Sequence, residues 1–299
     1  MKNKVQGVYT AIVTPFDAQG QLDEEGLRHN IRFQIENGID GIVALGTTGE
    51  CPTLSSQEKE RIILITVEEA KGKSTVMVGT GSYSTQQTIE NTRLAEALGA
   101  EMALVVSPYY NKPTQEGLYR HFKAVSEATS LPLILYNIQG RTGLNIATDN
   151  LKRIAELPNI IGIKEASGNI SQISDVIELV ANQRPDFCVM SGDDGLTLPL
   201  MALGGLGVIS VVSNLVPKQV KALVSACQQG DYTKARKLHC QLMPLFRGAF
   251  IETNPIPVKA AMSHYGMAAG SCRLPLCELT AESAHKLKGI LQTTNWHEI

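Results

Sequence analysis

The amino-acid sequence predicts an α/β protein, a (β/α)₈ TIM barrel with a C-terminal helical extension. Three observations lead to this prediction: eight short aliphatic or β-branched runs, stretches of helical period between most of them, and run starts about 20 to 34 residues apart. This alternation requires parallel strands joined by right-handed helical crossovers. Because the runs are apolar throughout, both faces of each strand must be buried, and eight such strands close naturally into a barrel.

The expected strands lack the alternating polar positions of a half-exposed sheet, and they span residues 8–13, 41–45, 75–79, 102–106, 133–136, 160–164, 187–190 and 208–212. Apolar residues at helical spacing predict helices between them, most clearly over residues 24–36, 56–70, 85–98, 115–128 and 170–181. An open doubly wound sheet is the rival topology. Its dinucleotide glycine pattern is missing, because the glycines at 204, 205 and 207 precede a strand instead of opening a helix.

No strand pattern follows Pro217. The remaining segments predict helices over residues 218–229, 232–243, 257–265 and 281–291, broken by Gly230, Pro244, Pro255 and Pro275. We therefore expect residues 1–224 to form the barrel that carries the active site, and residues 225–299 to form a helical subdomain packed on it.

Composition narrows the function classes. A net charge of -2 and a sequence pI near 6.3 give no broad attraction to nucleic acid or to an anionic membrane. No run approaches the ~18 apolar residues of a membrane span. The six cysteines show no CxxC pair and the six histidines no HExxH motif, so we expect reduced thiols and no metal site. These features predict a cytoplasmic protein that acts on a small molecule.

Lys164 is the most informative single residue, because it places a primary amine at the end of the apolar run 160–164. An amine kept from water favours its neutral form, which can attack a carbonyl and form a Schiff base. The alternative is a structural lysine that reaches solvent or pairs with Glu165. The sequence alone leaves both interpretations open.

Polar residues also follow the other expected strands, at the end where TIM barrels carry their active sites. The loop Gly46-Thr47-Thr48-Gly49 suits a carboxylate, or is a turn in which threonine caps a neighbour. The phenols of Tyr110 and Tyr136 suit proton transfer, or pack. Arg141 suits a second carboxylate, or is an ordinary surface residue. We expect Asp193-Asp194 to have a turn or helix N-terminal role.

These motifs resemble the dihydrodipicolinate synthase (4-hydroxy-tetrahydrodipicolinate synthase) family of pyruvate-dependent Schiff-base lyases, the superfamily that includes N-acetylneuraminate lyase. The resemblance covers nearly the whole chain, and Arg141-Thr142-Gly143 is its synthase-like signature. The motifs that carry it are Ala11-Ile12-Val13-Thr14-Pro15-Phe16, Gly46-Thr47-Thr48-Gly49-Glu50, Pro108-Tyr109-Tyr110-Asn111, Leu135-Tyr136-Asn137, Gly162-Ile163-Lys164-Glu165-Ala166, Ser191-Gly192-Asp193-Asp194 and Asn254-Pro255-Ile256-Pro257-Val258-Lys259.

The resemblance implies a site without an external cofactor. Lys164 would form a Schiff base with pyruvate, and Arg141 would hold the carboxylate of L-aspartate 4-semialdehyde. The product implied is 4-hydroxy-tetrahydrodipicolinate, on the route to diaminopimelate and lysine. The remaining implied roles are pyruvate carboxylate binding by Thr47 and Thr48, proton relay by Tyr136, Thr48 and Tyr110, and further substrate contacts by Ile209, through its backbone, and Gly192.

The resemblance also implies an oligomer and a regulatory site. The tyrosine at position 110 would enter the neighbouring subunit's site in a dimer, usually doubled to a tetramer. Lysine-inhibited relatives place polar and acidic residues at an allosteric site where this chain has Cys51, Pro52, Ser56, Lys59, Tyr83 and Gln87, and only Tyr109 keeps that pattern. Neutral Gln87 and cationic Lys59 predict weak or absent inhibition by lysine.

Two alternatives to a synthase remain at this stage. One is a related pyruvate-dependent aldolase or lyase that cleaves a sugar acid or a hydroxy-oxo acid. The other is a binding or regulatory protein that keeps the fold without turnover.

Overall fold

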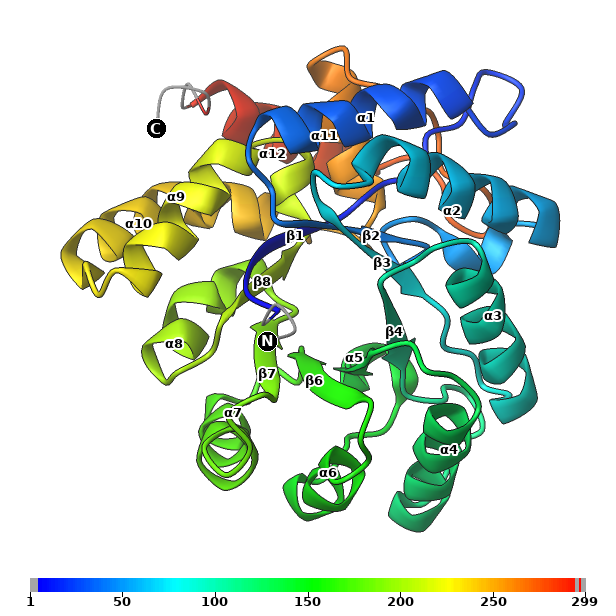
Figure 1. Ribbon diagram of the computed structural model, residues 1–299. Coiled ribbons are helices and arrows are strands. Elements are labelled where there is room, and N and C mark those ends of the chain that lie inside the picture. The colour runs from blue at the N-terminus through cyan, green and yellow to red at the C-terminus, as the bar shows by residue number, and fades with distance from the viewer. Residues whose placement is uncertain (1–4, 294–295, 297–299) are drawn as a thin grey trace. The chain divides into compact units, whose positions relative to one another are not determined.

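The computed structural model describes residues 5–293 and 296, and within them eight parallel strands form one closed barrel in chain order (Figure 1). The predicted fold class is therefore confirmed, and each expected run contains a strand. The strands are β1 Gly7–Ala11, β2 Gly41–Ala44, β3 Thr75–Gly79, β4 Met102–Val106, β5 Leu133–Asn137, β6 Ile160–Glu165, β7 Cys188–Ser191 and β8 Gly207–Ser210.

The described chain divides into two compact units. The first comprises residues 5–7 and 77–209, and the second comprises residues 8–76, 210–293 and 296. Helices of the first unit follow its strands along the chain (Figure 1): α3 Thr85–Ala97, α4 Gln115–Glu127, α5 Gln139–Thr142, α6 Thr148–Ala155, α7 Ile170–Val176, which continues as a π-helical turn Ile177–Ala181, and α8 Thr197–Ala202 after the 3₁₀ turn η3 Asp194–Leu196.

Strand register in the first unit places its key side chains. β4, β5, β6 and β7 pair in parallel with their neighbours, which sets Tyr136 opposite Lys164 and Lys164 opposite Met190. The strand interiors are apolar and fully buried, as for Ile134, Leu135 and Ile163. This packing follows from the continuous aliphatic runs, because strands covered on both faces need no polar positions.

The second unit combines the start of the barrel with the C-terminal helices. β1 pairs in parallel with β2, with Thr10 opposite Ile42. Asn30 of the first helix donates to the carbonyl of Ala268, at 2.7 Å, and so ties the two sequence ends of this unit together. The helices are α1 Glu24–Glu36, α2 Ser56–Ala70, α9 Pro217–Gln228, α10 Tyr232–Gly248, α11 Ile256–His264 and α12 Ala281–Gln292, with 3₁₀ turns η1 Cys51–Thr53 and η4 Val212–Asn214.

Helix α10 corrects one sequence-based boundary. We expected Pro244 to end the helix at residue 243, yet α10 continues to Gly248. A proline removes one backbone donor and crowds the preceding turn. The apolar face of Leu242, Leu245 and Phe246 is buried, and burying those side chains outweighs the local cost.

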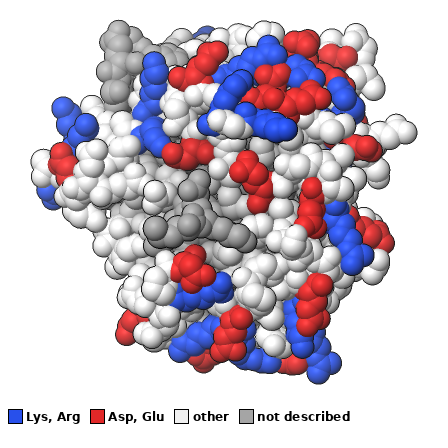
Figure 2. Space-filling model, viewed as in Figure 1, with Lys and Arg blue, Asp and Glu red and all other residues white. Residues whose placement is uncertain are grey.

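The surface over α1 and α2 carries interleaved charges, and Figure 2 shows Lys and Arg beside Asp and Glu there. Arg28 and Arg32 both contact Glu69, at 2.9 and 2.7 Å, and Arg61 contacts Glu24 at 2.6 Å. Opposite charges that pair in this way leave no single-sign patch on these helices. Within the described residues, every helix is too short or too polar to cross a membrane.

Candidate active site

Lys164 lies near the end of β6 with its side chain in the interior of the first unit. Only 6% of the residue is exposed, and its Nζ lies 4.3 Å from the centroid of the Tyr136 ring. The register of β5 and β6 produces this contact, because residues directly opposite in paired strands project side by side. The solvent-reaching alternative for Lys164 is therefore wrong.

The environment of Lys164 favours the neutral amine. Burial lowers the pKa of Lys164 to about 7, the Asp194 carboxylate opposes this lowering, and the Arg141 guanidinium adds to it. A pKa near 7 leaves a large fraction of the amine unprotonated at neutral pH. The site thus supplies the form of lysine that attacks a carbonyl.

The turn after β7 leaves room for the lysine stem. A Cβ atom at Gly192 would lie 3.1 Å from both Cγ and Cε of Lys164 and 2.8 Å from Cβ of Ala166. Asp193 caps η3 by accepting from the Gly195 amide at 2.8 Å, which confirms its expected turn role. Asp194, buried at 1% exposure, instead contributes a negative charge to the field at Lys164.

Glu165 does not act as the partner of Lys164. Successive side chains alternate along a strand, so Glu165 faces away from the side occupied by its neighbour. Its carboxylate accepts from the Ser167 amide at 2.6 Å and from Nδ2 of Asn137 at 3.1 and 3.4 Å. Burial raises the pKa of Glu165, partly offset by these hydrogen bonds. The pairing alternative for the lysine is therefore also wrong.

The loops after β4 and β5 present Tyr110 and Arg141. Tyr110 is 92% exposed and holds a left-handed backbone conformation, φ 68°. Arg141 is exposed on the short helix α5, and its charge acts on Lys164. Lys112, in the loop after β4, packs its aliphatic side chain against Gly143, which follows α5, so the two loops are in contact. The structure thus brings Arg141 into the field of Lys164 and leaves the phenol of Tyr110 in solvent.

Ile209 lies on β8, in the same unit as Lys164, and is 1% exposed. Its side chain is buried in the core of that unit. A substrate contact by the Ile209 backbone stays a prediction.

The second unit holds the loop Gly46–Glu50, which follows β2. Thr48 is 2% exposed, and its Oγ1 accepts a hydrogen bond from Nδ2 of Asn254 at 3.0 Å. Thr47 is half-buried. The loop is further bonded to Thr14, whose Oγ1 donates to the Gly49 carbonyl at 2.7 Å. The two hydroxyls are therefore presented by a loop held at several points.

A sequence model of the dihydrodipicolinate synthetase family matches residues 4–294. The chain belongs to this family.

Individual relatives agree with the family match. The 4-hydroxy-tetrahydrodipicolinate synthase of Protochlamydia amoebophila is 58% identical over 287 residues, 96% of each chain. The structure of the 4-hydroxy-tetrahydrodipicolinate synthase from Methylacidiphilum fumariolicum has a TM-score of 0.94 at 48% identity, covering 96% of this chain and 95% of that one. The chloride-inhibited dihydrodipicolinate synthase from Acinetobacter baumannii, complexed with pyruvate, has a TM-score of 0.93 at 42% identity, covering 96% and 98%.

The positions that the sequence resemblance relates to lysine inhibition lie in both units, and their surroundings are described for each unit separately. In the second unit, burial raises the pKa of the Cys51 thiol and the Lys59 ammonium partly offsets this, while Ser56 is exposed at the start of α2. In the first unit, Tyr83 packs edge-on against Tyr109 at 5.5 Å, and Gln87 donates to Asn91 at 3.1 Å. No anionic side chain occupies any of these positions.

Among the described residues, no group of three or more His, Cys, Asp or Glu side chains lies close enough together to hold a metal ion. Sequence reasoning missed the charge of Asp194 beside Lys164 in the first unit, and the contacts of Asn254 and Lys259 in the second. The sequence predicts only a turn or helix N-terminal role for Asp194, and it assigns no role to Asn254 or Lys259. No local signal could have found the contacts of Asn254 and Lys259, because their partners lie in loops more than 200 residues earlier in the chain.

Proposed function

We propose that this protein is a 4-hydroxy-tetrahydrodipicolinate synthase, a lyase that condenses pyruvate with L-aspartate 4-semialdehyde through a Schiff base on Lys164. The observation that carries the proposal is the buried Lys164 amine, whose pKa is lowered to about 7 beside the Tyr136 ring. Family membership and the names of the relatives support the choice of substrates.

The proposed reaction begins at the ketone of pyruvate. The neutral Lys164 amine adds to the ketone carbon, and loss of water from the carbinolamine gives the imine. Imine formation acidifies the pyruvate methyl group, and loss of a methyl proton gives an enamine. The enamine carbon attacks the aldehyde of the second substrate. The amino group of that substrate then attacks the imine carbon and displaces Lys164, closing the ring.

Separate side chains are assigned to the two substrate carboxylates. Thr47 and Thr48 hydroxyls and loop amides take the pyruvate carboxylate, and Arg141 takes the carboxylate of aspartate semialdehyde, for which a guanidinium fork is suited. The Arg141 charge also helps to keep Lys164 neutral. Gly192 leaves space at the lysine stem, and the backbone of Ile209 completes the pyruvate pocket.

Proton transfer is assigned to Tyr136, Thr48 and Tyr110. The Tyr136 ring lies against the reacting amine, so its side chain is placed to serve the carbinolamine. Tyr110 is 92% exposed in the single chain, which supports delivery of its phenol to a partner subunit's site. We therefore propose a dimer as the functional unit, doubled to a tetramer, in a cytoplasmic enzyme without a bound cofactor.

Borohydride trapping tests the proposal. Purified protein treated with pyruvate and borohydride is expected to carry a reduced adduct at Lys164, and a coupled assay with both substrates is expected to show turnover. Lys164→Ala removes the nucleophile, so nearly all activity and all adduct should disappear with the fold retained. Lys152→Ala, which alters an exposed lysine of the same unit, serves as the matched control.

Two outcomes would contradict the proposal. Absence of the adduct in the native protein would reject the whole Schiff-base class. An adduct with turnover on a sugar acid or a hydroxy-oxo acid, and none on aspartate semialdehyde, would assign the protein to a related lyase instead.

A further inference from the structure

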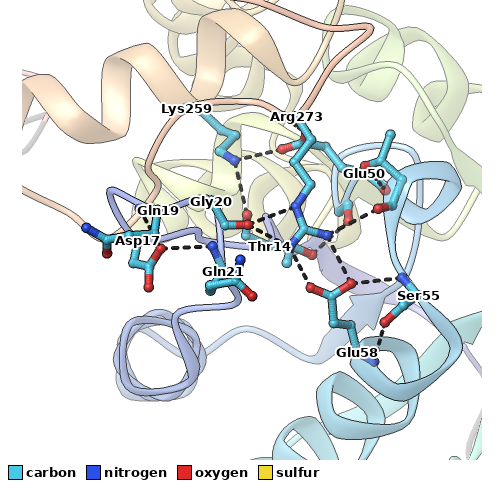
Figure 3. A network of polar contacts seen from close by, with 12 residues as sticks. Thr14, Asp17, Gln19, Gly20, Gln21, Glu50, Ser55, Glu58, Lys259 and Arg273 are labelled. Carbon is cyan, nitrogen blue, oxygen red and sulfur yellow. Dashed lines mark hydrogen bonds and ion pairs between the residues drawn. The ribbon is translucent and has the colours of Figure 1, made fainter.

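The loop Gly46–Glu50 is held by the chain around the start of α11, and Figure 3 shows the network that does so. The Nζ of Lys259 donates to Oε1 of Glu50 at 2.7 Å, to the Thr14 carbonyl at 3.1 Å and to the Ser271 carbonyl at 3.1 Å. An ammonium has three N–H donors, so each has a partner. Lys259 thereby fixes the loop after β1 and the loop after β2 together.

The backbone of Glu50 has a strained conformation that must be maintained by the residues around it. It lies in the left-handed region, φ 53° and ψ 33°, and Leu45 at the other end of the loop also has a positive φ of 56°. Residues other than glycine are strained there and keep such conformations only where their surroundings enforce them. The second carboxylate oxygen of Glu50 accepts from the backbone amide of Arg273 at 2.9 Å. Both oxygens of Glu50 are therefore fixed by the C-terminal chain.

The Glu50–Lys259 pair is almost fully buried, with 1% and 2% of the side chains exposed. Lys259 also lies over the Phe16 ring, 4.4 Å from its centroid. A buried ion pair often stabilises a fold no more than apolar residues of the same volume would, so its better-attested use is to select one geometry. The geometry selected here is that of the threonine loop.

Asn254 acts on the hydroxyl of Thr48 directly. Its Nδ2 donates to Thr48 Oγ1 at 3.0 Å, and both residues are buried. A hydroxyl has one proton to donate and an oxygen that accepts. With the Asn254 amide donating to that oxygen, the hydroxyl proton points to another acceptor. A carboxylate is such an acceptor, because it has no proton of its own.

We propose that Asn254 and Lys259 are positioning residues for carboxylate binding: Lys259 fixes the Thr47-Thr48 loop through Glu50 and Thr14, and Asn254 orients the Thr48 hydroxyl as a donor to the pyruvate carboxylate. This inference rests on the proposed function, which places pyruvate at this loop. Neither residue touches the substrate. Their substitution therefore changes the affinity for pyruvate more than the chemical steps.

Asn254→Asp gives the sharpest test. The substitution keeps the shape of the side chain but leaves an ionised acceptor that draws the Thr48 proton to itself and repels a carboxylate. We expect the KM for pyruvate to rise about tenfold or more, while the KM for aspartate semialdehyde changes less than about threefold. Because Thr48 is also assigned to proton transfer, kcat should fall as well, but by a smaller factor than the pyruvate KM rises. Asn254→Ala removes the donor without adding an acceptor, so its rise should be smaller. A purely structural role predicts the opposite order, with the truncated side chain worse.

Lys259 is tested by Lys259→Met and by chemical rescue. Lys259→Met should raise the pyruvate KM, and methylammonium or ethylammonium added to Lys259→Ala should lower the KM again by restoring a cation to the site. Lys221→Met is the matched control, because Lys221 pairs with Asp40, which directly precedes β2, instead of the loop that follows it. The control should lose a comparable ion pair without a change in the pyruvate KM.

The outcomes separate this inference from the proposed function. An unchanged pyruvate KM in Asn254→Asp, with normal borohydride trapping at Lys164, would overturn the inference and leave the synthase assignment standing. Failure of the native protein to trap pyruvate would overturn both. If Lys259→Met does not fold, the order of the two Asn254 variants decides alone.

Discussion

At the scale of single residues, the decisive property is the charge of one amine. Burial dominates the lowered pKa of Lys164, and two nearby charges act in opposite directions: Asp194 raises it and Arg141 lowers it. Desolvation penalises an ammonium because water no longer solvates the charge. The pKa of Lys164 is therefore set by burial together with two charges that follow β5 and β7 in the chain, Arg141 on α5 and Asp194 on η3.

The pH dependence of imine formation follows from this pKa. Below pH 7 the amine is protonated and cannot attack, so the rate of imine formation with pyruvate should rise through pH 7 and level off above it. Asp194→Asn removes a charge that favours the ammonium, so the inflection should move to lower pH. Rapid-quench borohydride trapping across pH 5 to 9 measures both curves. An inflection near 10, the value of a solvated lysine, would contradict the structural account.

His121 predicts a loss of stability in mild acid. Its ring lies between Thr85, at 2.9 Å from Nδ1, and Phe122, while its Nε2 is buried without a hydrogen-bond partner in the described structure. Burial lowers the pKa of His121 from 6.5 to about 4. The unfolded chain therefore binds this proton first, and the free energy of unfolding should fall by about 3 kcal/mol as pH drops from 6.5 to 4.

Urea unfolding of native protein and His121→Phe at pH 7.5 and 5 tests this prediction. The variant should be less stable at pH 7.5, because it loses the contact with Thr85, but should lose less stability between the two pH values. Glu58 and Glu69, whose pKa values are lowered to about 2 by their arginine partners, titrate below this window. Equal pH dependence in both proteins would remove His121 as the cause.

At the scale of elements, the segment that carries Ser56 and Lys59 is held in place by neighbouring residues. Helix α2 begins with a capping box, in which Ser55 and Glu58 each accept from the other's backbone amide, and Arg273 also contacts Glu58. This arrangement fixes the start of α2, where Ser56 and Lys59 lie. The two positions that the sequence resemblance relates to lysine inhibition on α2 are thus held by the hydrogen bonds at its start.

Lysine is expected to have little effect on turnover. A bound lysine needs a carboxylate for its ammonium group, and position 87 on α3 offers a neutral amide while Lys59 on α2 adds a like charge. Steady-state assays with L-lysine up to millimolar concentration should show less than about twofold inhibition, since an unpaired like charge disfavours binding. Strong suppression of turnover in that range would refute the prediction. Gln87→Glu, which restores one carboxylate, is expected to increase whatever sensitivity exists.

At the scale of the whole molecule, the exposed Tyr110 predicts a shared active site. Mixed oligomers of Lys164→Ala and Tyr110→Phe test this directly, because each parent protein should be strongly impaired. If Tyr110 serves the partner subunit, one site of each hybrid dimer has both an intact lysine and an intact tyrosine. Random mixing should then restore about a quarter of native activity, half of the dimers being hybrids with one intact site each.

The hybrid experiment has a clear negative outcome. If Tyr110 serves its own subunit, no hybrid site is complete, and the mixture should show only the sum of the two parent activities. Refolding the mixed proteins together, with each parent refolded alone as the control, ensures that subunits exchange.

The barrel could be predicted in detail because its signal is local. Eight aliphatic runs gave eight strands, with ends within a few residues of those expected, since a strand buried on both faces must be apolar. The short helices α5, α6 and α8 were not predicted, because four to eight residues carry too few turns for a periodic signal. The prediction that Pro244 ends this helix was wrong, because burial of the apolar face of α10 outweighed the tendency of proline to end helices.

In the candidate site, too, some features could be predicted from the sequence and others could not. The sequence by itself determined which residues end the strands, and hence the identities of Lys164, Tyr136 and the threonine loop. Only the tertiary structure decided that the lysine is buried, that Glu165 faces elsewhere, and that Asn254 and Lys259 brace a loop about 200 residues earlier. The physical reason is that burial, electrostatic fields and hydrogen bonds depend on distances in space, which a linear order of residues does not contain.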